Sequence, residues 1–197
     1  MHERLKLLRT ILTDYDINYR DEEIQIDIIR KHNFAIRFIL KPSINVQKTA
    51  IALNPKTYNH INNPSTEIQI FLVNRNGDNI KLINKPSTEV KMAAIRKLGR
   101  SIKYINNPTL EMQLLAIKDL HENVQYIKAP HEKVQLEVVR FNMKYISYIK
   151  KPTVAVVAVV INAGFKEIQL YKNFRYSGIK LNHLTNDELV QLKLIMS

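Results

Sequence analysis

Side chains that commonly carry catalysis or bind metals are few in this chain and lie far apart. The chain contains no cysteine, which removes thiolate nucleophiles, disulfides and cysteine-ligated zinc. Its histidines do not have the short spacing of a metal site. Two of them are each followed by a glutamate, but the pair His121–Glu122 and the pair His131–Glu132 fall in different predicted turns. The four glycines are isolated, so no phosphate-binding loop is indicated. We expect no catalytic residue, no cofactor, no metal and no small-molecule substrate.

The arginines and lysines indicate a different chemistry, because they recur at fixed intervals. Counted from a proline that returns every 22 residues and is taken as position 0, bases recur at positions 10, 11, 14 and 17. Bases aligned along a stack of repeats could follow phosphates, with binding that tolerates sequence and weakens with salt. The residues predicted to form this basic face are Arg30, Lys31, Arg37, Arg75, Lys81, Arg96, Lys97, Arg100, Lys103, Lys118, Arg140 and Lys144.

Two further recurring side chains have both a structural and a recognition interpretation. Tyr104, Tyr126 and Tyr148 share position 18 and could stack on bases, although half-buried packing beside neighbouring isoleucines is the favoured interpretation. A glutamine column at position 5 favours a structural hydrogen-bonded ladder over a recognition row. Its members are Gln25, Gln47, Gln69, Gln113 and Gln135.

The net charge of +12 favours an anionic partner, either nucleic acid or an acidic protein surface. Positions 0 to 9 of the repeats carry nine acids and four bases, whereas positions 10 to 21 carry twenty bases and four acids. The helix dipole favours acids at helix starts and bases at helix ends, and it accounts for most of this alternation. It does not account for the excess of bases, since a balanced sequence would satisfy the dipole equally well.

These positions belong to a 22-residue repeat that is written seven times over residues 20–174, most clearly from Asn63 and from Lys85. Apolar residues at positions 4, 8 and 9 predict an α-helix of about three turns, and those at positions 16 and 19 predict a second helix of about two turns. Neither helix can bury its apolar face alone, so the copies must stack. The prolines that mark the period are Pro42, Pro64, Pro86, Pro108, Pro130 and Pro152.

Residue types also predict where the longer helix begins and ends. We expect the proline in the first turn, where its missing N–H is tolerated, and either a neighbouring Ser or Thr or the preceding asparagine as the cap. At the other end, Asn33, Gly77 and Gly99 are expected to adopt the left-handed conformation that often closes a helix. The candidate caps are Ser43, Ser65, Ser87, Thr109 and Thr153.

The fold class expected is all-α, as a right-handed α-solenoid of about seven helix-turn-helix repeats with capping helices at both ends. A length of 197 residues and a hydrophobic fraction of 45% fit a single domain, with an N-terminal cap over 1–19, repeats over 20–174 and a C-terminal cap over 175–197. No apolar stretch approaches the roughly 18 residues of a membrane span, so no membrane partner and a cytoplasmic location are expected.

The repeated phrase Pro-Ser-Thr-Glu-Val/Ile, followed by Ile-Lys-Tyr-Ile-Asn, resembles the short two-helix repeats of bacterial, phage and giant-virus proteins. More distantly it is similar to HEAT-like and leucine-rich-repeat-variant solenoids. The resemblance covers about residues 20–174 and implies a binding scaffold. One HEAT-like group, the alkyl-purine DNA glycosylases, relies on tryptophan and an acidic residue, but this chain has no tryptophan.

Three functions follow from these observations. The first is a non-catalytic scaffold whose basic face binds nucleic acid. The second is a phage- or mobile-element-encoded interaction module that docks on an acidic surface of a larger protein and modulates it, for example by inhibition. The third and least favoured is a HEAT-like DNA-repair enzyme. A viral source would place the protein in the host cell.

Overall fold

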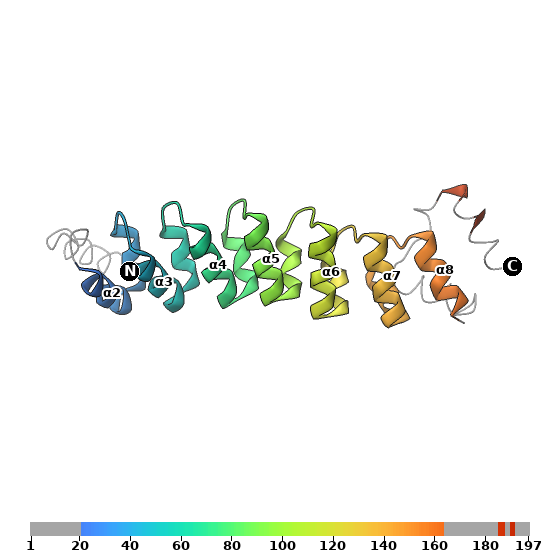
Figure 1. The fold of residues 1–197 in the computed structure, drawn as a ribbon, viewed down its shortest axis with the longest axis horizontal. Coiled ribbons are helices and arrows are strands. Elements are labelled where there is room, and N and C mark those ends of the chain that lie inside the picture. The colour runs from blue at the N-terminus through green and yellow to red at the C-terminus, as the bar shows by residue number, and fades with distance from the viewer. Residues whose placement is uncertain (1–20, 164–184, 188–189, 192–197) are drawn as a thin grey trace, which may run out of the picture. The chain divides into compact units, whose positions relative to one another are not determined.

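Helices and connecting turns account for the part of the chain that the structure, a computed structural model, describes: residues 21–163, 185–187 and 190–191. Over residues 21–163, seven α-helices alternate with six 3₁₀ helices (Figure 1). The all-α prediction is therefore confirmed for these residues. The predicted N-terminal cap over 1–19 and most of the C-terminal cap over 175–197 lie outside the described residues.

The chain divides into two compact units, Met1–Lys97 and Leu98–Ser197. The first unit contains α2 (Glu22–Lys31), η2 (Asn33–Phe38), α3 (Ile44–Leu53), η3 (Pro55–His60), α4 (Thr66–Arg75), η4 (Gly77–Leu82) and α5 (Thr88–Lys97). The second unit contains η5 (Gly99–Tyr104), α6 (Leu110–Asp119), η6 (His121–Tyr126), α7 (Glu132–Phe141), η7 (Met143–Tyr148) and α8 (Val154–Asn162). Each η element is a 3₁₀ helix.

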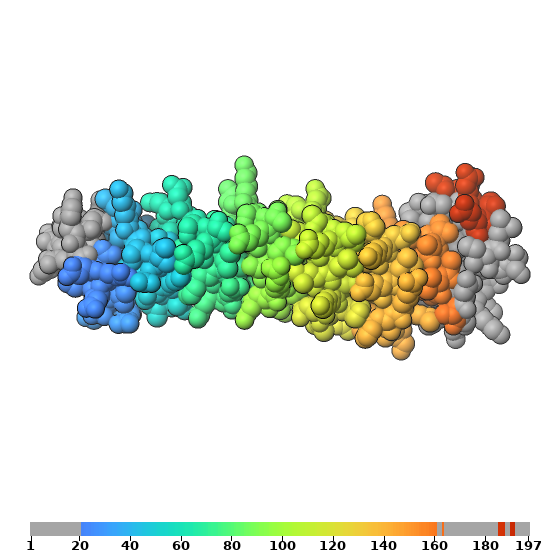
Figure 2. Space-filling model, viewed as in Figure 1, coloured from blue at the N-terminus to red at the C-terminus, as the bar shows by residue number. Residues whose placement is uncertain are grey.

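Within each unit the elements pack in chain order. In the first unit α2 contacts α3, α3 contacts α4 and α4 contacts α5, and η2, η3 and η4 contact one another in the same sequence. In the second unit α6, α7 and α8 follow the same pattern, as do η5, η6 and η7. Figure 2 shows that successive repeats of a unit form adjacent bands of surface. A given repeat position therefore recurs along each unit, about 10 Å from copy to copy at ordinary helix packing distances.

The predicted apolar positions form the core. Positions 8 and 9 are buried in the regular copies, as in Leu72 with Val73 and Val138 with Val139. Position 16 is buried in each described copy, in Ile36, Tyr58, Ile80, Ile102, Val124 and Ile146. Position 19 is buried likewise, in Ile39, Ile61, Ile83, Ile105, Ile127 and Ile149.

The first copy departs from this pattern at position 4. Ile24 was expected in the core but is 43% exposed, while Gln25 and Ile29 are buried. This copy has Arg20 in place of the proline, and its N-cap residue, Asp21, makes no side-chain capping hydrogen bond. The start of α2 therefore lacks the proline and serine that fix the register of later copies.

The shorter helix of each repeat is a six-residue 3₁₀ helix, which makes two turns as predicted but ends at position 18 and does not include position 19. A 3₁₀ helix has three residues per turn, so side chains three apart lie on one face. In η4, Ile80 points inward, and Ile83 follows the helix end in extended conformation with φ −97° and ψ 120° while remaining buried. Positions 14 and 17 are also three residues apart, so their side chains lie together on another face of the 3₁₀ helix.

The starts of the α-helices settle which residue is the cap. The hydroxyl of Ser65 accepts from the Ile68 N–H at 3.4 Å, and that of Thr109 accepts from the Met112 N–H at 3.3 Å. Ser43 and Ser87 cap their helices in the same way. The proline therefore precedes the cap and lies outside the first turn, which corrects the prediction.

Thr153 was another expected cap, and that prediction is wrong. Its hydroxyl is buried and makes no hydrogen bond in the described part of the chain.

The predicted left-handed helix ends are also wrong. Asn33, Gly77 and Gly99 are the first residues of 3₁₀ helices, and the residue before each has a negative φ, from −142° at His32 to −161° at Leu98. A residue that begins a 3₁₀ helix has a negative φ that any residue adopts, so no glycine is needed at this position for its conformation.

Left-handed backbone occurs instead at position 21, directly before the proline. Its φ is 48° at Asn63, 52° at Lys85 and 49° at Asn107. Gly99 has a different role, because a Cβ there would lie 2.5 Å from the side-chain nitrogen of Asn123. It allows η5 and η6 to approach closely.

Candidate nucleic-acid interface

Contacts between successive copies show that the α-helices of one unit run in the same direction. In the second unit the side-chain oxygen of Gln113 accepts from the His131 N–H at 2.8 Å, which joins the start of α6 to the start of α7. In the first unit the Arg75 guanidinium donates to the Ala52 carbonyl at 3.3 Å, which joins the end of α4 to the end of α3. Each unit therefore has one edge of helix starts and one edge of helix ends.

The glutamine column is structural in four copies. Each side-chain amide donates to the carbonyl of the proline of its own repeat, at 2.8 to 3.2 Å. The pairs are Gln47 with Pro42, Gln69 with Pro64, Gln113 with Pro108 and Gln135 with Pro130. These bonds reach backbone groups of the same repeat rather than the next glutamine. The column therefore ties each proline turn to its own helix and does not form the expected side-chain ladder.

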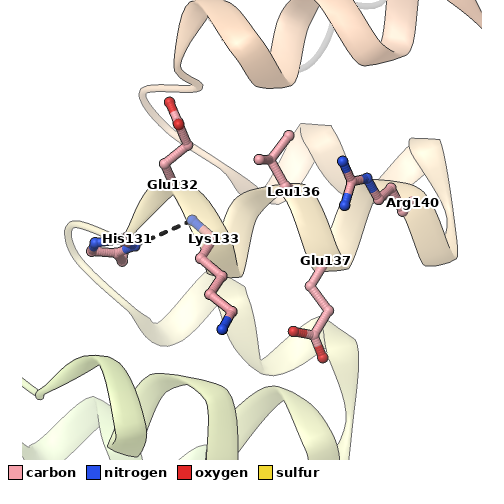
Figure 3. A pocket seen from close by; sticks show the side chains of 6 residues that line it. All are labelled: His131, Glu132, Lys133, Leu136, Glu137 and Arg140. Carbon is pink, nitrogen blue, oxygen red and sulfur yellow. Dashed lines mark hydrogen bonds between the residues drawn. The ribbon is translucent and has the colours of Figure 1, made fainter.

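Charge follows the two edges. Glu67, Glu89, Glu111 and Glu132 lie in the first turns of α4 to α7, and bases lie in the last turns of the same helices. Figure 3 shows this polarity on α7, with Glu132 at its start and Arg140 at its end. The edge of helix ends is therefore the basic one in each unit.

The predicted basic residues are all exposed. Those at positions 10 and 11 lie in the last turns of the α-helices, and those at positions 14 and 17 extend along the 3₁₀ helices. The first unit brings together Arg30, Lys31, Arg37, Arg75, Lys81, Arg96 and Lys97, and the second brings together Arg100, Lys103, Lys118, Arg140 and Lys144. Each unit thus carries its own section of the predicted face.

Several of these bases already have a partner in the protein. Arg30 forms an ion pair of 3.2 Å with Asp27 in the same helix, and Arg75 binds the Ala52 carbonyl. The Arg37 guanidinium lies 5.4 Å from the ring centre of Phe38. The side chains of six other predicted bases form no hydrogen bond or ion pair with the described residues: Lys31, Arg96, Lys97, Lys118, Arg140 and Lys144.

Tyrosines and a lysine alternate along the 3₁₀ helices of the second unit. The Lys103 ammonium lies 4.8 Å from the ring centre of Tyr104 and 5.8 Å from that of Tyr126 in the next repeat. Tyr104, Tyr126 and Tyr148 are 39%, 36% and 40% exposed. The rings are thus partly packed, as the sequence favoured, and partly open to a ligand.

The second unit also contains an aromatic row that the sequence did not indicate. His121 stacks on Phe141 with ring centres 3.9 Å apart and planes at 5°. Phe141 lies 6.2 Å from Tyr145, and Tyr145 lies 5.7 Å from Tyr148, both in stacked orientation. The four residues occupy different repeat positions, so a column indicated only Tyr148, at position 18. The one available signal was that His121 stands where two other copies have glycine.

Three titratable rings are shifted by their surroundings, and burial raises the pKa of one of them, Tyr58 in the first unit. A hydrogen bond of 3.0 Å from the Tyr145 hydroxyl to Glu122 is the main cause that raises the pKa of Tyr145, with smaller effects of burial and nearby charge. In the first unit, burial and then the charge of Arg37 lower the pKa of His60, whose ring meets Phe34 edge-on at 5.7 Å. All three shifts favour the uncharged form of the ring.

An open pocket of about 370 Å³ lies on the surface of α7 (Figure 3). It is lined by His131, Glu132, Lys133, Leu136, Glu137 and Arg140. The His131 ring accepts from the Lys133 N–H at 3.2 Å and so caps the helix. The pocket is lined by both acids and bases, so it does not select one sign of ligand charge.

Within residues 21–163 and the short described segments beyond, no group of three or more side chains is placed to bind a metal ion. The same residues contain no helix long and apolar enough to cross a membrane.

Comparisons of the chain with protein-family models, with curated proteins and with solved structures gave no match. The resemblance to short two-helix repeat proteins therefore stays a prediction from the repeated phrase.

Proposed function

We propose that this protein is a non-catalytic helical-repeat scaffold that binds nucleic acid through its basic face. In this proposal the whole chain is a right-handed α-solenoid of about seven repeats, closed at both ends by capping helices and related to the short two-helix repeat proteins. The chain-order packing of repeats within each unit supports a solenoid.

The observation that most directly supports this proposal is the row of exposed bases at the edge of helix ends. In the second unit Lys118 and Arg140 occupy the same repeat position on adjacent helices, and neither forms an ion pair within 4 Å among the described residues. A row of uncompensated bases attracts a row of phosphates, and binding releases the counterions that the phosphates hold. The predicted binding depends on salt and little on sequence.

Polarisation titrations of labelled duplexes and single strands, at about 50 mM and about 200 mM salt, test this proposal. We expect binding at low salt that weakens by at least about tenfold at the higher salt, since several phosphate contacts are lost together. Absence of binding at low salt, or binding that does not respond to salt, would overturn the proposal.

One observation favours the second function, docking on an acidic protein surface. Large apolar side chains are exposed beside the bases at helix ends: Leu53 is 49%, Leu120 56% and Phe141 65% exposed. Apolar and basic side chains side by side suit a protein interface better than a phosphate backbone alone. In that case the titrations stay flat, and replacing these residues by serine weakens binding to the partner protein.

A further inference from the structure

We infer that the second unit carries a binding site for unpaired bases, so that the protein prefers single-stranded nucleic acid to duplex. The inference rests on the proposed function for its electrostatic part and adds the class of nucleic acid. The site is the set of partly exposed rings on the second unit, called here the aromatic platform. It consists of Tyr104, His121, Tyr126, Phe141, Tyr145 and Tyr148.

Exposure separates the platform from rings that only fill the core. Tyr58 in the first unit packs at position 16 and is 7% exposed. On the platform, Tyr148 is 40% exposed and Phe141 is 65% exposed although it stacks on His121. Rings exposed to this degree keep part of their surface open to a ligand.

Rings in near-parallel orientation offer flat apolar surface of the kind on which bases stack. Phe141, Tyr145 and Tyr148 follow one another at 6.2 and 5.7 Å, with planes within 21° of parallel. In a duplex the faces of the bases are already covered by their neighbours, whereas a single strand can turn its bases onto aromatic side chains. The platform therefore suits a single strand.

The charges around the platform match the phosphates of such a strand. Arg140 precedes Phe141 directly and Lys144 precedes Tyr145, while Lys103 lies between Tyr104 and Tyr126. Aromatic rings interleaved with bases are typical of sequence-tolerant single-strand binding.

The acidic side chains on the edge of helix ends already accept hydrogen bonds from other groups of the protein. Among the described residues of the second unit, positions 10 to 21 carry two acids, Asp119 and Glu122. Asp119 accepts from the Gly99 N–H at 2.9 Å, and Glu122 accepts from the Tyr145 hydroxyl at 3.0 Å. Their charges are thereby turned toward protein donors rather than toward a phosphate.

The test compares three ligands on the full chain: a single strand, a duplex of equal length, and a single strand without bases. Tyr126→Leu, Phe141→Leu and Tyr148→Leu each remove a π face and keep apolar volume. Phe34→Leu is the matched control, since Phe34 is a 42% exposed ring in the first unit. We expect each platform variant to bind the normal single strand roughly tenfold more weakly and the other two ligands unchanged.

Tyrosine emission gives a second readout that needs no variant, because the chain contains no tryptophan. A normal single strand should quench the emission of the unaltered protein more than a strand without bases does. Equal quenching would overturn the inference.

The outcomes separate the inference from the proposed function. If all three ligands bind equally well and the leucine variants match the unaltered protein, the inference fails and the proposed function stands. If no ligand binds, both fail, and docking on an acidic protein surface becomes the better account.

Discussion

The side-chain oxygen of Gln113 accepts a hydrogen bond of 2.8 Å from the backbone N–H of His131, 18 residues further along the chain. The same side chain donates to the Pro108 carbonyl at 3.0 Å and is 6% exposed. One buried amide thus satisfies a backbone group in each of two successive repeats and sets their spacing, on which the alignment of the bases depends.

Gln113→Met should destabilise the protein by about 1–3 kcal/mol, because the His131 N–H and the Pro108 carbonyl both lose a partner. Denaturant unfolding measures the change. Gln47→Met is the control at the same repeat position. Its side-chain oxygen is buried without a hydrogen bond to the described residues, so only the bond to Pro42 is lost and the cost should be smaller. Equal costs would contradict the role given to Gln113.

Lys85→Asn should stabilise the protein by about 0.5–1 kcal/mol, because Lys85 holds a φ of 52° that asparagine adopts more readily. Lys41→Asn makes the same charge change at the same repeat position without positive φ and should be close to neutral. Thermal unfolding of both variants measures the difference in stability. An equal shift of the unfolding temperature in the two variants would show that the change of charge alone is responsible.

Gly99→Ala should destabilise the second unit by at least about 1–3 kcal/mol through overpacking. The added Cβ would lie 2.5 Å from the Asn123 side-chain nitrogen and 2.7 Å from the Ala116 carbonyl oxygen. Those two groups are hydrogen-bonded to each other at 2.9 Å and cannot both move aside without breaking that bond. An unchanged midpoint of unfolding would refute this.

Stability should fall on acidification in part because of His60. Its pKa is lowered below the ordinary 6.5 by burial and by Arg37, so the folded protein favours the neutral ring more than the unfolded chain does. That contribution is complete above pH 6.5 and is lost as the pH falls through the lower folded-state pKa. His60→Gln should therefore show a shallower loss of unfolding free energy between about pH 7 and pH 5. Identical pH profiles would show that His60 contributes nothing.

The sequence predicts the core of the repeat well, because burial of isoleucine and valine at fixed intervals is a direct consequence of apolar periodicity. Ile80 and Ile83 were both expected inside, and both are buried. The spacing of three between them was already the 3₁₀ period, but three-residue spacing also occurs on α-helices, so the type of helix stayed open.

Backbone conformation between elements was predicted less well. Gly99 shares its repeat position with Gly77, but its role depends on Asn123, 24 residues away in sequence and in contact only after stacking. Lys85 carries a left-handed conformation that its residue type does not indicate.

The candidate site was predictable only where its residues share a repeat position. Bases such as Lys118 and Arg140 share one repeat position, and stacking places them on one edge. Phe141 and His121 hold different positions in different copies, and only their 3.9 Å contact shows that they belong together.

The most direct test of the basic face is a comparison of two double variants with the same change of net charge. Lys118→Glu with Arg140→Glu alters the edge of helix ends, and Lys91→Glu with Lys133→Glu alters the side of helix starts. Titrations of a single strand over a range of salt concentrations should show the first variant losing affinity and its log–log salt slope becoming shallower by about 0.7 per lost contact. The second variant should keep the slope of the unaltered protein. Equal losses in both variants would show that net charge alone governs binding, and the account of a specific basic face would be contradicted.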